Sequence, residues 1–216
     1  MSVQVIPKNK GRKQLFNNPL LERLTRTHIA IPISIFVLYA ISLLVYSIYS
    51  VQTLTPTQTG LFFFIGLLTF TLVEYVMHRF LFHIGTSTKK REKFQYTLHG
   101  VHHEYPKDKE RLAMPPVMSI TISTGLLFLF KLFLGAKVFA FLPGFLVGYA
   151  GYLVMHYVQH MFKAPKGFFN SWWANHAVHH YKDQTKAYGV TSPFWDHVFG
   201  TMPTKKVTTI TGNIDK

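Results

Sequence analysis

The chain has 216 residues, 48% of them hydrophobic, and a formal net charge of +14. A nucleic-acid-binding protein accounts for the charge but not for long apolar runs, whereas a multi-pass membrane protein carries both, because its Lys and Arg gather in cytoplasmic loops. The lack of cysteine excludes disulfides, cysteine-ligated metals, iron–sulfur clusters and a cysteine nucleophile. The composition favours a membrane protein and argues against nucleic acid as a partner.

Residues 1–28 form a basic, polar arm, and its segment Leu20–His28 has the pattern of a short helix lying on a membrane surface. Because no apolar run lies near Met1, we do not predict a cleavable signal peptide. We expect an integral membrane domain over residues 29–203 and a C-terminal tail over residues 204–216.

Four apolar stretches, each near the ~20 residues that a transmembrane helix needs, follow the arm. They are Ile29–Tyr49, Leu61–Phe82, Val117–Leu134 and Phe139–His160. In the last stretch Gly144, Gly148 and Gly151 permit close helix approach in lipid. The sequence predicts an all-α, multi-pass membrane protein with four transmembrane helices; the alternative is two long buried hairpins in a soluble protein.

The basic residues are unevenly distributed between the predicted loops. Residues 1–28 contain six Lys or Arg, residues 84–114 contain seven, residues 161–216 contain seven, and residues 50–60 contain none. By the positive-inside rule, both termini and the 84–114 loop lie in the cytoplasm. We expect the chain in a bacterial cytoplasmic membrane or in the endoplasmic reticulum.

Ten of the twelve histidines lie in four clusters, HRFLFH, HGVHH, HYVQH and HAVHH. They are His78, His83, His99, His102, His103, His156, His160, His176, His179 and His180. Helical positions i, i+3 and i+4 share a face, so HGVHH and HAVHH each present three imidazoles on one face and HYVQH presents two. The i, i+5 spacing of HRFLFH sets its two rings apart, so that they serve different metals or flank a helix end.

The predicted topology brings all four clusters to one membrane face. Ten ligands are too many for one ion, whereas two ions with roughly five each would use them all and leave room for oxygen or water. The alternative is a solvated histidine-rich surface or a weak metal-scavenging patch. His28 and His197, outside the clusters, are interpreted as interfacial residues or as residues that support the ligands.

The nine acidic residues narrow the metal chemistry. Neither the HExxH of zinc hydrolases nor the Glu-x-x-His of soluble di-iron bundles occurs. An all-histidine dinuclear site at a membrane surface is suited to activating dioxygen against a lipid C–H bond. Because this needs a redox metal, we expect iron in the working enzyme, and zinc can fill the same site in purified protein.

Five segments resemble motifs of the fatty acid hydroxylase superfamily, and within it the fatty acid 2-hydroxylases that act on sphingolipid acyl chains. These segments are EYVMHRFLFH (Glu74–His83), LHGVHHEYPKDKERLAMPP (Leu98–Pro116), HYVQH, HAVHHYK and YGVTSPFWDHVFGT (Tyr188–Thr201). The match runs from about Phe16 to Pro203 and includes residues between the histidines.

This resemblance implies that all ten clustered histidines bind two metal ions, within a four-helix membrane bundle that has a cytoplasmic helical cap. It also implies that O2 and two electrons place a hydroxyl on C2 of a long acyl chain, free or within a ceramide. Many eukaryotic members carry an N-terminal cytochrome b5 domain, for which the arm before the first helix is too short. We therefore expect a separate electron-donor protein, such as cytochrome b5 or a ferredoxin.

Four polar residues near the clusters are candidates for supporting roles. Glu74, one turn before His78, either orients a ligand histidine through its second nitrogen or pairs with Arg79. Asp196 is a second candidate, and Asn175 and Glu104 are weaker ones.

Two rival functions are considered. One is a sterol, carotenoid or alkyl-lipid hydroxylase or desaturase of the same superfamily, which the four-residue gap in HRFLFH and the run RLAMPP disfavour. The other is a metal transporter or metal-sequestering membrane protein, which would place ligands near the bilayer midplane rather than at one face.

Overall fold

The computed structural model describes residues 5–203, so the predicted tail at residues 204–216 lies outside the described residues. Across residues 5–203 all regular structure is helical and no strand occurs. This confirms the all-α prediction. The chain divides into two compact units, which we call the histidine unit (residues 5–13, 74–107 and 158–203) and the helical unit (residues 14–73 and 108–157).

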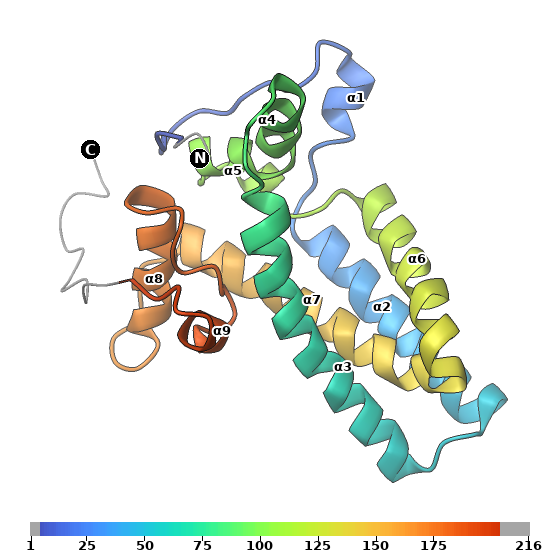
Figure 1. The fold of residues 1–216 in the computed structure, drawn as a ribbon. Helices are drawn as coiled ribbons and strands as arrows, with labels where there is room; N and C mark the ends of the chain where they lie inside the picture. The colour runs from blue at the N-terminus through green and yellow to red at the C-terminus, as the bar shows by residue number, and fades with distance from the viewer. Residues whose placement is uncertain (1–4, 204–216) are drawn as a thin grey trace. The chain divides into compact units, whose positions relative to one another are not determined.

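The helical unit contains the long apolar helices (Figure 1). Its elements are the short α1 (Pro19–Arg23), α2 (Ala30–Tyr46) with the π-helical Ser47–Val51, most of α3 (Pro56–Val76), α6 (Pro116–Leu134) and most of α7 (Val138–Met161). Helix α2 packs beside α6. Pro116 begins α6, since proline at a first helical position has no N–H to leave unsatisfied, and Gly135 ends it with a φ of +56°.

Within residues 5–203, three helical segments are long and apolar enough to cross a membrane, in agreement with the predicted membrane character. They are Ala30–Val51, Pro56–Phe82 and Lys109–Met161. The third contains both α6 and α7, joined by the short 3₁₀ turn Gly135–Lys137.

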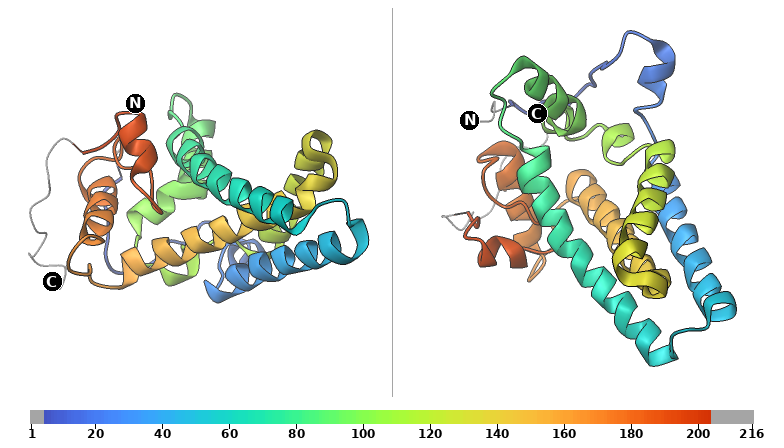
Figure 2. Two further views of the ribbon diagram at one scale, coloured as in Figure 1. Left: turned by 90° about the horizontal axis from the view of Figure 1, so that it is seen from below. Right: turned by 45° about the vertical axis from the view of Figure 1, so that its right-hand side comes forward.

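Glycines let α3 and α7 cross with their backbones in contact (Figure 2). A Cβ atom on Gly66 would lie 1.9 Å from the carbonyl oxygen of Phe141, and one on Gly144 would lie 1.8 Å from that of Phe63. Gly151, on the same helix as Gly144, faces open space. A Cβ atom on Gly148 would lie 2.9 Å from the side chain of Phe70. The predicted close approach therefore occurs at Gly144 and Gly148, but not at Gly151.

Glu22 is the centre of a network of ions and backbone groups in the helical unit. Its carboxylate accepts hydrogen bonds from Arg26 at 2.7 Å and from Arg111 at 2.5 Å, and from the backbone N–H groups of Leu15 and Phe16. Arg111, the arginine of the RLAMPP run, has a side chain that is 4% exposed. This network ties the arm before α2 to the segment before α6.

The histidine unit consists of short elements around the clustered histidines. They are the π-helical Met77–Phe82, α4 (Lys89–Gln95), the π-helical Tyr96–Gly100, α5 (Val101–Glu104), α8 (Asn170–Tyr181) and α9 (Phe194–Val198).

Candidate metal centre

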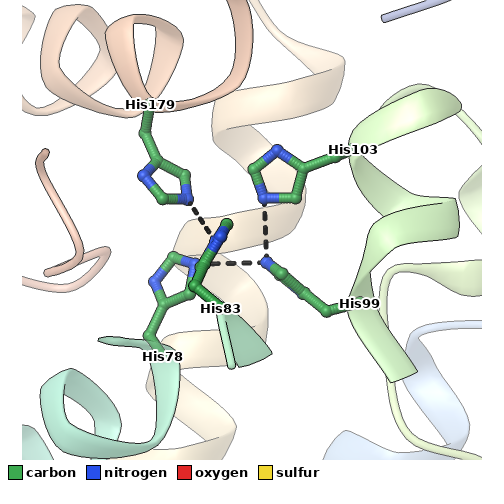
Figure 3. A group of neighbouring side chains, drawn as sticks. All are labelled: His78, His83, His99, His103 and His179. Atoms are coloured by element: carbon green, nitrogen blue, oxygen red, sulfur yellow. Dashed lines mark hydrogen bonds between the residues drawn. The ribbon is translucent and has the colours of Figure 1, made fainter. Parts of the chain in front are cut away.

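Five histidines from three parts of the chain form the first group, which we call group 1 (Figure 3). Each offers one ring nitrogen, and the five nitrogens all lie within 4.8 Å of one another. The members are His78, His83, His99, His103 and His179.

The π-helical turn Met77–Phe82 explains how both histidines of HRFLFH join group 1. A π-helix bonds residue i to i+5, so it brings positions i and i+5 closer in azimuth than an α-helix does. The ring centroids of His78 and His83 lie 5.2 Å apart. The structure gathers the two rings in one group, whereas the expectation that they serve different metals assumed α-helical geometry. His83 follows the last residue of the π-helical turn as its C-cap, so the alternative that the rings flank a helix end agrees with the structure.

A second cluster, which we call group 2, contains His102, His160 and His180 in the histidine unit, with one nitrogen of each within 4.8 Å of the others. His176 adjoins it, because its Nε2 atom lies 2.8 Å from Nε2 of His160. Across the described residues, groups 1 and 2 consist of histidines alone.

The two HxxHH motifs contribute to both groups. In HGVHH, His99 and His103 belong to group 1 and His102 to group 2, while in HAVHH His179 belongs to group 1 and His180 to group 2. The prediction of three imidazoles on one helical face did not foresee this division. It makes the two groups neighbours along both segments.

His156 is the one clustered histidine that belongs to the helical unit. It lies on α7 four residues before His160, is buried, and stacks on the Tyr152 ring at a centroid distance of 5.5 Å. Its role as a ligand stays a prediction.

The buried nitrogens of the groups fit a cation. Both ring nitrogens of His180 are buried without a hydrogen-bond partner, which is costly, and a bound cation would satisfy the one that carries the lone pair. Burial, followed by the charge of His78, lowers the pKa of His83 to about 3. Burial, followed by neighbouring imidazoles, holds the pKa of His179 and His180 well below the ordinary value. The rings are therefore neutral, which is the form that binds metals.

Two backbone carbonyls orient two histidines of group 1. Nδ1 of His78 lies 2.6 Å from the carbonyl oxygen of Tyr188, and Nδ1 of His179 lies 2.7 Å from that of Lys186. A carbonyl only accepts, so each Nδ1 carries the proton and donates it. In the neutral ring the lone pair is then on Nε2, which faces group 1 (Figure 3).

The sequence model of the family described as "Fatty acid hydroxylase" matches residues 63–201, which is more than half of the chain and includes all ten clustered histidines. The chain belongs to the fatty acid hydroxylase family.

Curated relatives and one solved structure extend this assignment. The chain is 38% identical to the ceramide very long chain fatty acid hydroxylase scs7 of Schizosaccharomyces pombe, over 90% of this chain and 56% of that protein. It is 39% identical to the dihydroceramide fatty acyl 2-hydroxylase FAH2 of Arabidopsis thaliana, over 88% and 80%. The solved structure of full-length scs7p, with only the hydroxylase domain visible, matches at a TM-score of 0.80 and 32% identity, over 90% of this chain and 73% of that chain.

The chain spans between about two fifths and four fifths of the length of the curated relatives that it matches. The fatty acid 2-hydroxylase of Homo sapiens is 33% identical over 67% of this chain and 40% of its own length.

The predicted supporting residues lie at different places in the chain. Glu74 accepts hydrogen bonds from the backbone of Val190 and Thr191, whereas we expected it either to orient a histidine or to pair with Arg79. Asp196, also buried, accepts from the backbone N–H of Tyr188. Glu104 bonds Lys8 at 2.5 Å. Asn175 lies half-buried on α8, one position before His176.

Sequence reasoning missed Lys186 and Tyr188 because their contribution is a backbone carbonyl, which any residue carries. Ala187, which lies between them, has a left-handed φ of +54°, and no sequence pattern predicts this conformation. The one usable signal was the similarity of Tyr188–Thr201 to the terminal signature of the family.

Proposed function

We propose that this chain is a membrane-embedded dinuclear oxygenase that hydroxylates C2 of a long-chain fatty acyl group, free or within a ceramide. The observation that carries the proposal is the pair of adjoining, buried, all-histidine groups in a chain of this family. The names of the relatives, which specify ceramide fatty acid hydroxylases and fatty acyl 2-hydroxylases, support the substrate class.

The proposed membrane topology has four crossings with both termini in the cytoplasm. The segment Lys109–Met161 has 53 residues, which would be about 80 Å long as one helix, against a hydrocarbon core of about 30 Å. Two crossings, α6 and α7, fit this length. The charge distribution along the sequence supports a cytoplasmic position for the histidine unit, which would act as the cap.

Two metal ions are proposed, one in each group. Group 1 would hold its ion with five imidazoles, and group 2 would hold the other with His102, His160 and His180, joined by His156 and His176. Iron is the proposed working ion, because the reaction needs a change of valence, and zinc is the expected substitute in purified protein. Iron would supply the activation of dioxygen.

The reaction consumes the acyl chain, O2, two electrons and two protons, and it yields the 2-hydroxy acyl chain and water. The proposed source of the two electrons is a separate donor protein, such as cytochrome b5 or a ferredoxin. In this reaction the role of the chain is to hold the imidazoles neutral and fixed and to exclude water from the buried ring nitrogens. Imidazoles already held by backbone carbonyls need little reorganisation when metal binds.

Expression in a host that lacks 2-hydroxy lipids tests this function. Lipid mass spectrometry should detect 2-hydroxy acyl chains with the parent chain and none with the double variant His179→Ala, His180→Ala. The matched control, His197→Ala, changes an exposed histidine outside both groups and should make the same product as the parent.

Other products would point to the rival functions. A hydroxyl or a double bond elsewhere on the lipid would place the chain with the sterol, carotenoid or alkyl-lipid enzymes of the superfamily. If the lipids are unchanged when iron and an electron donor are supplied, and metal is transported across the membrane, the result would favour a transporter. Within the described residues both buried groups consist of histidines alone, which favours an oxygenase over a transporter. The names of the relatives favour a fatty acyl substrate over a sterol, a carotenoid or an alkyl lipid.

A further inference from the structure

Two buried carboxylates capture consecutive backbone N–H groups of one loop in the histidine unit. Oδ1 of Asp196 accepts from the N–H of Tyr188 at 2.9 Å, and Oδ2 accepts from that of Gly189 at 2.8 Å. Oε1 of Glu74 accepts from the next two N–H groups in the chain, those of Val190 at 2.7 Å and Thr191 at 2.9 Å. The loop 188–191 is thus held by two acids that lie on different elements.

The first residue of this loop, and Lys186 two positions before it, present the carbonyls that hold two histidines of group 1. Tyr188 accepts from His78, and Lys186 accepts from His179. Ala187, between the two carbonyls, is 1% exposed and has a φ of +54°, a conformation that costs a non-glycine residue about 1 kcal/mol or more. Such a conformation persists only where the surroundings over-determine it.

The packing around the loop leaves it little freedom. A Cβ atom on Gly189 would lie 2.2 Å from the carbonyl oxygen of Ser192 and 2.9 Å from Oδ2 of Asp196. Glu74 and Asp196 are 7% and 1% exposed. Buried carboxylates are costly unless several hydrogen bonds satisfy them, and here the loop N–H groups supply those bonds.

We infer that Glu74 and Asp196 are positioning residues, which clamp the loop 188–191 so that the Tyr188 carbonyl fixes the tautomer and the ring orientation of His78. The inference rests on the proposed metal centre and deepens it. It assigns both acids an indirect role, through the main chain, in place of direct contact with a histidine. Partners of this kind, behind a ligand, typically change metal affinity by about 10- to 100-fold when they are lost.

Amide substitutions distinguish this clamp from a simple effect of charge. In Asp196→Asn, the NH2 group of the amide must face the backbone N–H of either Tyr188 or Gly189, whichever way the amide is turned. Both groups are donors and a backbone N–H cannot accept, so one hydrogen bond is lost in either orientation. In Glu74→Gln, the amide oxygen can still accept from Val190 and Thr191, and the NH2 group faces the Thr191 hydroxyl, which bonds the other oxygen of Glu74 and can accept instead. Glu74→Met keeps the length and removes both acceptors.

The experiment measures the metal that the full-length protein in detergent retains against increasing chelator, together with its thermal unfolding. We expect Asp196→Asn and Glu74→Met to retain metal about 10-fold or more less tightly than the parent, and Glu74→Gln to stay within about 2-fold. Glu92→Gln, an exposed acid on α4, is the control and should match the parent. A role of charge alone would make Glu74→Gln as harmful as Glu74→Met, which would overturn the inference.

A second comparison separates positioning from general support of the fold. If Asp196 acts through His78, then Asp196→Asn should weaken metal retention much less in a His78→Ala background than in the parent. Equal weakening in both backgrounds would overturn the inference. If Asp196→Asn fails to fold, Thr201→Val is used in its place, because it removes one hydrogen bond of 2.6 Å to Oδ1 of Asp196. Thr201→Val should weaken metal retention less than Asp196→Asn would, and again less in the His78→Ala background than in the parent.

The outcomes also separate this inference from the proposed function. A parent that hydroxylates lipid and holds metal, with Asp196→Asn indistinguishable from it, would overturn the clamp and leave the function standing. A parent that binds no metal when iron or zinc is supplied would overturn both.

Discussion

His103 and His180 stack face to face, with ring centroids 4.2 Å apart and an interplanar angle of 16°. His103 belongs to group 1 and His180 to group 2. This contact joins the two groups inside the histidine unit, and it makes each ring part of the wall of the other site. This adjacency supports the proposed dinuclear centre.

Removing His180 should empty group 2 more than group 1. In His180→Ala one of two proposed ions loses a ligand, so the bound metal of the purified protein should fall to about half of the parent content. Elemental mass spectrometry on protein reconstituted with zinc measures this. His197→Ala is the matched control and should keep the parent content; an unchanged content in His180→Ala would contradict the assignment of His180 as a ligand.

Gly144→Ala should destabilise the helical unit, because its Cβ would lie 1.8 Å from the Phe63 carbonyl oxygen and would force α3 and α7 apart. Overpacking of this kind costs about 1–3 kcal/mol. Thermal unfolding in detergent should show a lower Tm for Gly144→Ala. Gly151→Ala, on the same helix, adds a Cβ in open space and should leave the Tm near that of the parent. Equal effects of the two variants would refute the close backbone contact.

Gly189→Ala should weaken metal binding together with stability. The new Cβ would displace the Ser192 carbonyl, 2.2 Å away, and with it the loop that holds His78. We expect a lower Tm and less metal retained after dialysis against chelator. Gly85→Ala, at an exposed glycine with no atom within 4 Å of its Cβ, serves as the control. A variant Gly189→Ala with parental metal retention would show that the loop tolerates movement.

Glu22 should stabilise the fold down to low pH. Burial alone would raise the pKa of Glu22, but hydrogen bonds from Arg26 and the backbone, with the charge of Arg111, outweigh it and lower the pKa to about 2. A carboxyl with a lowered pKa stabilises the fold fully above its unfolded value, here 4.5, and loses that contribution as the pH falls towards 2.

The comparison of the parent with Glu22→Gln isolates this contribution. The difference in Tm should be constant above about pH 5.5 and should shrink below about pH 4.5. A difference that does not change between pH 6 and pH 3.5 would show that Glu22 has an ordinary pKa. Measuring the difference removes the titration of the histidines, which both proteins share.

Much of the fold follows from the sequence because its signals are local. Apolar runs of membrane length predicted the long helices, and three candidate spans confirm the membrane character. Glycine spacing correctly indicated the contacts at Gly144 and Gly148, but Gly151, three residues after Gly148, faces open space. Spacing defines a face of a helix, whereas the crossing point depends on the partner helix.

The site was predictable as a set of residues but not as an arrangement. The clustered histidines could be identified from the sequence because ten of the twelve lie in four short motifs. The structure brings nine of them together in the histidine unit. Their division into two groups depends on the π-helical turn at Met77–Phe82 and on tertiary contacts, which leave no periodic pattern. The hydrogen bonds of Glu74 reach residues more than 100 positions away, so its proximity to His78 in sequence misdirected the expectation.

Isotope labelling of the lipid product tests directly whether the chain places a hydroxyl from O2 on C2 of the acyl chain. A host that lacks 2-hydroxy lipids, expressing the parent chain, is fed a fatty acid with two deuterium atoms on C2 under ¹⁸O2, and the lipids are analysed by mass spectrometry. The account predicts a product that has gained one ¹⁸O atom and lost one deuterium, because the hydroxyl comes from O2 and replaces a hydrogen on C2. A product that keeps both deuterium atoms, or whose new oxygen is not ¹⁸O, would contradict it.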